Sequence, residues 1–138
     1  MKLFLAIHIG VYRLSGGKVG GEIRGVKVLL LTTIGRKSGK TRTVPLGFFE
    51  RQGGYLIVGS NNGQPTHPSW YHNIESKPEI AVKVSRKIIP VTAEVLTGEA
   101  RTQAWQQVTA AAPGYANYEK KTKREIPLVL LRPSNQSR

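Results

Sequence analysis

Residues 26–60, VKVLLLTTIGRKSGKTRTVPLGFFERQGGYLIVGS, decide the fold. The run 26–33 is almost wholly apolar or β-branched, which is typical of a strand buried on both faces. A second strand is predicted over 42–50, where Pro45 requires a bulge or a sheet edge. The turn at Gln52-Gly53-Gly54 leads into a third strand over 55–60, so the last two strands form a hairpin.

The pattern continues on the C-terminal side with short elements separated by breakers. A short helix is predicted over 68–75, ended by Pro78, and strands over 79–84 and 87–96 meet at a tight turn. A helix over 98–112 stops at Pro113-Gly114, a second short helix covers 115–123, and a last strand covers 126–131. About six mostly antiparallel strands with short helices predict an α+β fold built on a closed or half-closed barrel.

The length of 138 residues suits one domain, which we expect to span residues 1–138 with a frayed tail at 134–138. An apolar run over 3–11 follows Lys2, and this predicts an N-terminal helix over 1–14. At roughly 11 residues the run is shorter than the about 20 needed to span a bilayer. Three roles remain open for this segment: it could dock on the core, lie on a membrane surface through flanking cations such as Arg13, or be cleaved as a signal.

The charge balance points to an anionic partner. There are 21 Lys and Arg against 8 acids, a net charge of +13, and all the acids are glutamates. Nucleic acid, a membrane surface or a polyanionic small molecule would fit this excess. The absence of cysteine excludes disulfides and thiolate chemistry and fits a cytoplasmic protein. His67 and His72 lack a third ligand, so no metal site is predicted.

A basic loop, residues 35–42, is the strongest binding signal. It carries Arg36, Lys37, Lys40 and Arg42 with Ser38 among them, and its glycines allow a sharp turn that presents N–H groups to an anion. A solvated basic turn is the plain alternative. The run Lys120, Lys121, Lys123 and Arg124 is typical of a solvated face.

Two further segments could line a pocket. The stretch 67–73, HPSWYHN, places aromatic and hydrogen-bonding groups at a helix start, where either a ligand or a core contact through Trp70 would suit them. Tyr115 and Tyr118 are three positions apart and share a helix face. The sequence shows no hydrolytic triad or carboxylate-pair motif, so a bound cofactor would supply the chemistry of an enzyme built this way.

These motifs, in their order and spacing, resemble the deazaflavin-dependent nitroreductase and quinone reductase family, which uses coenzyme F420. The resemblance runs from about Tyr12 to Pro133 and rests on LLTTIGRKSG (30–39), RTVPL (42–46), HPSWYHN (67–73), YANY (115–118) and IPLV (126–129). It implies a split β-barrel related to FMN-binding barrels. It also implies an F420H2-dependent oxidoreductase that passes hydride to a quinone, a nitroaromatic or another electron-poor acceptor, and a cofactor tail with a phosphodiester and several glutamates.

The family's functional residues carry over onto matching positions. The resemblance implies that the phosphate and tail are bound by Arg36, Lys37, Ser38 and Arg42. It implies that the deazaflavin ring is lined, largely by backbone, by Thr43, Val44, Pro45, Leu46, Gly47, Val58, Gly59, Ser60 and Asn61. The cofactor site would be closed by Ser69, Trp70, Tyr71, His72 and Asn73. Ser60, Tyr115 and Tyr118 would be the catalytic residues, with Tyr115 also contacting the cofactor, because their hydroxyls can orient or protonate the acceptor.

Two positions depart from the family pattern. Gly47 stands where an aromatic residue is common, and Ala112 stands where nitro-reducing members can have a tyrosine. We therefore expect a less crowded acceptor pocket. An FMN- or haem-binding barrel and a basic nucleic-acid-binding module are the alternatives, although no recognition helix is evident and no nucleic-acid partner is expected. Peripheral contact with the inner face of the cell membrane is an additional expectation, because quinones dissolve in bilayers.

Overall fold

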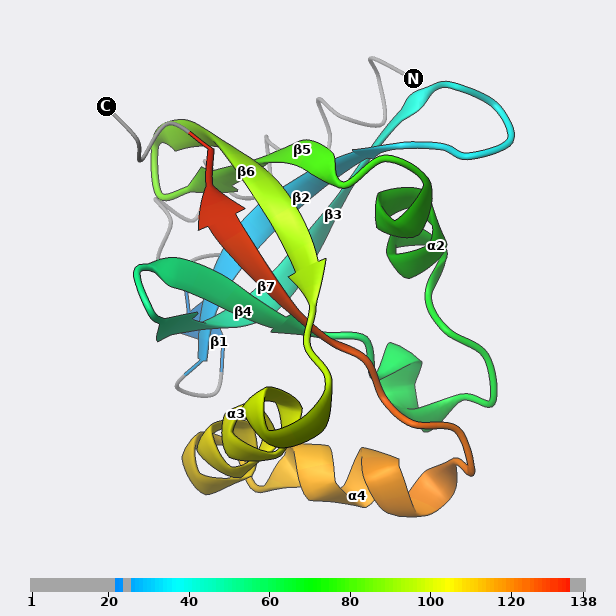
Figure 1. Cartoon of the computed structure of the whole chain (residues 1–138), viewed down its shortest axis with the longest axis vertical. Helices are drawn as coiled ribbons and strands as arrows, with labels where there is room; N and C mark the ends of the chain where they lie inside the picture. Colours follow the sequence, from blue (N-terminus) through cyan, green and yellow to red (C-terminus); the bar gives the residue numbers. More distant parts are fainter. Residues whose placement is uncertain (1–21, 24–25, 135–138) are drawn as a thin grey trace.

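A closed antiparallel barrel forms the body of the molecule (Figure 1). The computed structural model describes residues 22–23 and 26–134, so the expected N-terminal helix over 1–14, its membrane contact, and residues 135–138 of the expected tail lie outside the described residues. The elements are β1 (Glu22–Ile23), β2 (Val26–Ile34), β3 (Thr41–Arg51), β4 (Gly54–Val58), η1 (Asn61–Gly63), α2 (Ser69–Ser76), β5 (Glu79–Val84), β6 (Lys87–Val95), α3 (Gly98–Ala111), α4 (Gly114–Lys121) and β7 (Leu128–Pro133).

The strands follow the order β1-β2-β3-β4-β7-β6-β5, and β5 pairs with β2 to close the ring. All neighbouring strands among the described residues are antiparallel, with Leu31 opposite Val82 at the closure and Leu56 opposite Leu130 between β4 and β7. The predicted α+β barrel is therefore confirmed. The strands alternate inward and outward, so β3, β4 and β7 each supply side chains to two separate apolar clusters.

The first cluster fills the barrel interior. It contains Leu29 and Leu31 of β2, Ile57 of β4 and their inward-facing neighbours, and Trp70 and Ile74 of α2 close one end. The second cluster lies on the outer face of β4 and β7. There α3 and α4 cover it (Figure 1), and it is made of Phe49, Leu56, Val58, Leu96, Ala104, Val108, Ile126, Leu128 and Leu130.

The structure changes two of the predicted strand ends and one detail of the expected tail. β4 ends at Val58 rather than at Ser60: the Gly59 N–H still donates in register to the Pro127 carbonyl at 2.8 Å, but Pro127 has no N–H to donate in return. β7 begins at Leu128 rather than at Ile126, since Pro127 has no N–H to donate. Ser134, at the start of the expected tail, still donates its N–H to the Pro90 carbonyl.

Pro45 lies at an edge rather than at a bulge. The pairing of β2 with β3 runs without interruption from Lys27–Phe48 to Ile34–Thr41. On its other side β3 pairs with β4 only over Phe49–Arg51. Among the described strands, residues 41–48 therefore have no partner on that side, and we call this open side of β3 the seam. Among the described residues, no helix has the length and apolar character needed to cross a membrane.

Candidate functional site

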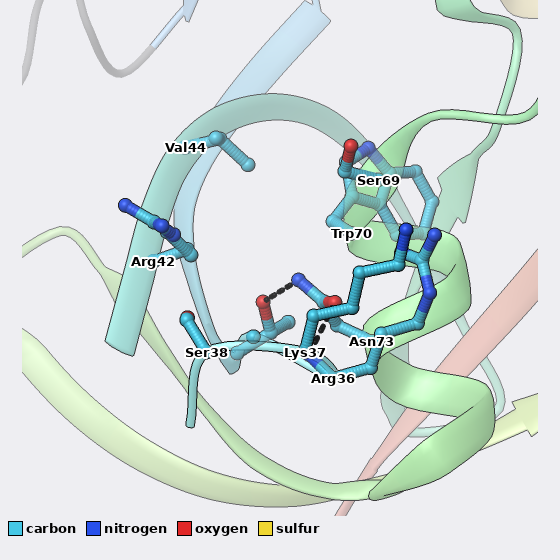
Figure 2. A pocket seen from close by; sticks show the side chains of 10 residues that line it. Arg36, Lys37, Ser38, Arg42, Val44, Ser69, Trp70 and Asn73 are labelled. Carbon is cyan, nitrogen blue, oxygen red and sulfur yellow. Dashed lines mark hydrogen bonds between the residues drawn. The ribbon is translucent and has the colours of Figure 1, made fainter. Parts of the chain in front are cut away.

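A cavity of about 500 Å³ opens at the end of the barrel, between the basic loop and α2 (Figure 2). That volume lies in the range of small-molecule sites. The cavity is lined by Thr33, Gly35, Arg36, Lys37, Ser38, Arg42, Val44, Ser69, Trp70 and Asn73. Two segments that the sequence predicts as binding elements, the basic loop and the start of the 67–73 helix, thus meet at one site.

The alternation of side chains along β3 explains which of its residues line the cavity. Val44 packs against the interior cluster, and Arg42, two positions earlier on β3, faces the same side at the barrel mouth. Trp70 is only 8 % exposed, because its ring closes the interior cluster while part of it lines the cavity. Trp70 therefore both anchors α2 to the core and forms part of the cavity wall.

The basic loop is held in a tight turn by its own backbone. The Gly35 N–H donates to the Lys40 carbonyl at 2.7 Å, and the Gly39 N–H donates to the Gly35 carbonyl at 2.8 Å. Gly39 has φ +73°, a conformation that favours glycine. The expectation that the glycines present N–H groups to an anion is therefore wrong, since both groups are already bonded.

Asn73 joins this loop to the barrel and to α2. Its side-chain amide donates to Thr33 Oγ1 at 3.1 Å, and its Oδ1 accepts the Arg36 N–H at 3.1 Å (Figure 2). Both Asn73 and Thr33 are buried. Buried polar groups without partners are costly, so these paired bonds fix where the loop leaves the barrel.

Positive charge dominates the cavity. Arg36, Lys37 and Arg42 all line it, and none of its lining residues is acidic. Figure 2 shows the side chains of Arg36 and Lys37 extending along α2 toward Ser69, whereas Arg42 comes from β3 on the other side. Guanidinium and ammonium groups arranged around one space suit a ligand with several anionic groups. Among the described residues, no group of three or more His, Asp or Glu side chains could hold a metal ion.

The seam leads away from this cavity along β3. Arg51 and Gly54 close a two-residue hairpin turn, so Arg51 directs its backbone groups toward β4. Backbone direction alternates along a strand, and Thr43, Pro45 and Gly47 therefore direct their backbone groups into the seam. Pro45, which has no N–H, is tolerated on this side. The Thr43 side chain turns away from the cavity and contacts Thr32 Oγ1 at 2.9 Å.

Tyr115 and Tyr118 lie beyond the far end of the seam. Their rings are 5.8 Å apart, and Tyr115 also packs edge-on against Phe49. A Cβ added to Gly47 would lie 3.4 Å from Tyr115 Oη, so the glycine leaves room for that hydroxyl. Burial, and to a smaller extent Tyr118, raises the pKa of Tyr115 above its usual 10.0. Its hydroxyl is therefore a protonated donor at neutral pH.

The distance between the two ends follows from strand geometry. From Arg42 at the cavity to Gly47 beside Tyr115, β3 advances five residues, about 17 Å at about 3.4 Å per residue. Val58 is the last residue of β4, Gly59 and Ser60 follow it, and Asn61 begins η1. α4 packs on η1, with Tyr118 against Gly63. Tyr71 and His72 are on α2 but outside the cavity lining, and His72 lies 3.4 Å from Glu75.

Arg124 is a residue that the sequence interpretation missed. The expected solvated face holds for exposed Lys120, Lys121 and Lys123, but it is wrong for Arg124. This side chain is half-buried and bonds to the loop that begins at Gly59. Burial lowers the pKa of Arg124 from its usual value, although the guanidinium stays charged. Its partners lie about sixty positions earlier in the chain, so no local pattern could reveal them.

Comparison with known proteins gives consistent results. The family model described as F420H(2)-dependent quinone reductase matches residues 5–133. An F420H(2)-dependent quinone reductase of Mycobacterium tuberculosis is 37% identical over 131 residues, covering 92% of this chain and 88% of that protein. The solved structure of an F420-H2 dependent reductase, FDR-A, is 43% identical with a TM-score of 0.69, covering 76% of this chain and 93% of that chain.

More distant structures share the fold alone. A FAD-binding protein from Mesorhizobium loti is 12% identical with a TM-score of 0.57, covering 89% of this chain and 88% of that chain. The predicted split β-barrel related to flavin-binding barrels is thus confirmed.

Proposed function

Because the chain belongs to the F420H(2)-dependent quinone reductase family, we propose that it takes hydride from reduced coenzyme F420 and delivers it to a quinone. The observation that carries this proposal is the cavity of about 500 Å³ with three cationic side chains and no acid in its lining. A cofactor tail with a phosphodiester and several glutamates matches that charge. When bound, the reduced deazaflavin supplies the hydride.

In this proposal the basic loop binds the tail. Arg36 and Arg42 offer planar guanidinium groups from opposite sides, Lys37 adds a mobile ammonium, and Ser38 adds a hydroxyl. The Ser38 hydroxyl also accepts the Lys40 N–H at 3.1 Å, so it is oriented before a ligand arrives. Asn73 keeps the loop in position and reduces the ordering cost of binding.

The ring would lie along the seam. The backbone groups of Thr43, Pro45 and Gly47 face that side of β3, and a strand edge offers both donors and acceptors to a planar heterocycle. Residues 58–61 would form the opposite wall, and residues 69–73 would close the end nearest the tail. No strong acid or base is required there, because hydride leaves the cofactor directly.

The acceptor would bind at the tyrosine end. Ser60, Tyr115 and Tyr118 supply hydroxyl groups that can orient a quinone oxygen and protonate it as it becomes a hydroquinone. Gly47 and Ala112 carry no bulky side chain, so we expect this end to be less crowded than in relatives with aromatic residues there. We expect it to accept a broad quinone more readily than nitroaromatics, which are the second acceptor class to test.

Titration with oxidised F420, followed by its visible absorbance, tests the cofactor. Losing one charge-assisted contact costs about 1.5–3 kcal/mol, and less at exposed side chains such as Arg36 and Lys37. We therefore expect Arg36→Ala and Lys37→Ala each to weaken binding about tenfold, since about 1.4 kcal/mol corresponds to tenfold. Lys87→Ala, an equal charge loss on the remote β5–β6 hairpin, is the control.

Three outcomes would separate the alternatives. If wild type fails to bind at tens of micromolar, or if all three variants bind alike, the proposed site is wrong. Preferential binding of FMN or haem in parallel titrations would favour the alternative cofactors. After binding is established, turnover with a panel of quinones and nitroaromatics defines the acceptor class.

A further inference from the structure

One guanidinium group, that of Arg124, holds most of the segment 59–67. Arg124 Nη1 donates to the Gly59 carbonyl at 3.1 Å, Nη2 donates to the Ser60 carbonyl at 2.8 Å, and Nε donates to the Gln64 carbonyl at 3.0 Å. The fourth contact joins Nη1 to His67 Nδ1 at 2.8 Å. Four contacts from one side chain restrain both ends and the middle of this segment.

The segment connects the two ends of the proposed site. It begins beside Ser60, at the acceptor end, and finishes at Pro68, immediately before Ser69 and Trp70 enter the cavity wall. In Figure 1, η1 lies between α2 and α4. Arg124, just after α4, is therefore placed to fix α2 and the Ser60 segment relative to each other.

The contact with His67 requires one protonation state. A guanidinium only donates, so His67 Nδ1 must accept with its lone pair, and the neutral ring carries its proton on Nε2. A second proton, on Nδ1, would place an N–H donor against the N–H donors of the guanidinium. Burial, then the charges of Arg124 and His72, lower the pKa of His67 below its usual 6.5, and Glu75 opposes this more weakly.

The other surroundings of His67 are aromatic. Its ring centroid lies 4.8 Å from that of Tyr71 and 5.8 Å from that of His72. Burial and Glu75 raise the pKa of Tyr71, so its phenol stays neutral when His67 titrates. The charged or titratable groups that act on His67 are thus Arg124, His72 and Glu75.

We propose that Arg124 and neutral His67 form a clamp that positions residues 59–67 for the reaction, and that protonation of His67 opens it. Both act as positioning residues. The role in turnover rests on the proposed function, whereas the clamp itself can be measured on the free protein. The wild type should lose coenzyme turnover as the pH falls below the ordinary histidine range, because the clamp releases Ser60 and the start of α2.

Matched variants of His67 separate the acceptor from the titrating ring. In His67→Asn, the amide oxygen occupies the place of Nδ1 and can still accept from Arg124, but it does not titrate near neutrality. We expect this variant to keep most of its turnover at neutral pH and to lose the acid limb of the pH profile, which is the fall in turnover at low pH. His67→Leu removes the acceptor, and misplacing reacting groups by about 1 Å costs on the order of 10²-fold in rate, so turnover should fall toward that limit.

The partner residue is tested in parallel. Arg124→Lys keeps the charge but cannot reach four acceptors at once, so it should resemble His67→Leu. Lys123→Ala is the control, because it removes one exposed charge beside the clamp and should leave turnover and its pH profile unchanged. Equal turnover and equal acid limbs in His67→Asn, His67→Leu and wild type would overturn the proposal.

Nitrogen-15 NMR of His67 provides a readout without coenzyme. The wild type should show an unprotonated Nδ1 and a protonated Nε2, and hydrogen exchange over 59–67 should accelerate in His67→Leu but not in His67→Asn. A wild-type Nδ1–H ring would overturn the clamp even if F420 binds. The expected NMR and exchange pattern without F420 binding would instead refute the proposed function and retain the clamp.

Discussion

Replacing Asn73 with alanine should destabilise the protein and loosen the basic loop together. Asn73 is 5 % exposed and Thr33 is 1 % exposed, so the Thr33 hydroxyl would lose its side-chain donor in a place with little access to water. The Arg36 N–H would also lose its acceptor, although the exposed loop allows water to replace it. The Asn73 side chain thus makes two hydrogen bonds that contribute unequally to the free energy of unfolding.

The magnitude follows from these two contacts. Leaving a buried group unsatisfied costs about 1–3 kcal/mol, and a hydrogen bond that water can replace contributes about 0.5–1.5 kcal/mol. We expect Asn73→Ala to lower the free energy of unfolding by about 2–4 kcal/mol, measured by urea titration. The exposed Ser76→Ala on the same helix should change it by less than about 0.5 kcal/mol. F420 affinity should also fall, since the loop would have to be ordered on binding.

A double-mutant cycle tests the reasoning. Thr33→Val removes the hydroxyl that Asn73→Ala would strand, so the double variant should be more stable than the sum of the two losses predicts. Coupling between contacting residues typically reaches about 0.5–3 kcal/mol. Additive losses within about 0.5 kcal/mol, or a loss below about 1 kcal/mol in Asn73→Ala alone, would refute the assigned role of this contact.

Three further predictions rest on steric fit at two glycines and on the proton affinity of Tyr115. Gly54→Ala should destabilise by about 1–3 kcal/mol or more in urea titration, since its Cβ would lie 2.5 Å from the Leu131 carbonyl oxygen. Gly114→Ala meets no atom within 4 Å and should stabilise by about 0.4–1 kcal/mol. Because burial raises the pKa of Tyr115, turnover should show no alkaline limb from its hydroxyl below pH 10.0, its usual value. A limb near pH 9 that Tyr115→Phe abolishes would contradict this.

The barrel was largely predictable because local sequence patterns mark most of its strands. Apolar runs such as 26–33 and breakers such as Gly53 and Pro113 mark where elements begin and end. The boundaries that differed depend on distant partners: the β4–β7 ladder ends where Gly59 meets Pro127, a residue that no pattern near Gly59 specifies. Short β1, Glu22–Ile23, was not predicted, because a two-residue strand has no periodicity.

The candidate site, too, was only partly predictable from the sequence. The cationic loop and the Trp70 helix were visible in the sequence, and the structure brings them to one cavity. The internal bonding of the loop glycines and the bridge from Asn73 to Thr33 were not visible, since both depend on the folded chain. Arg124 was the largest omission, because an arginine among lysines resembles a solvated cation until its partners are known.

The ring of strands also has a consequence for how the chain folds. β2 joins β3 through a short loop, but closure requires Leu31 to find Val82, and β4 must find β7 at Leu56 and Leu130. Such contacts can form only after long stretches of chain have lost their freedom, and proteins dominated by them fold in milliseconds to seconds rather than microseconds. The β2–β3–β4 meander can assemble from neighbouring segments, whereas the β2–β5 closure must wait for the rest. Kinetic vulnerability to aggregation should therefore concentrate in the interval before β5 reaches β2.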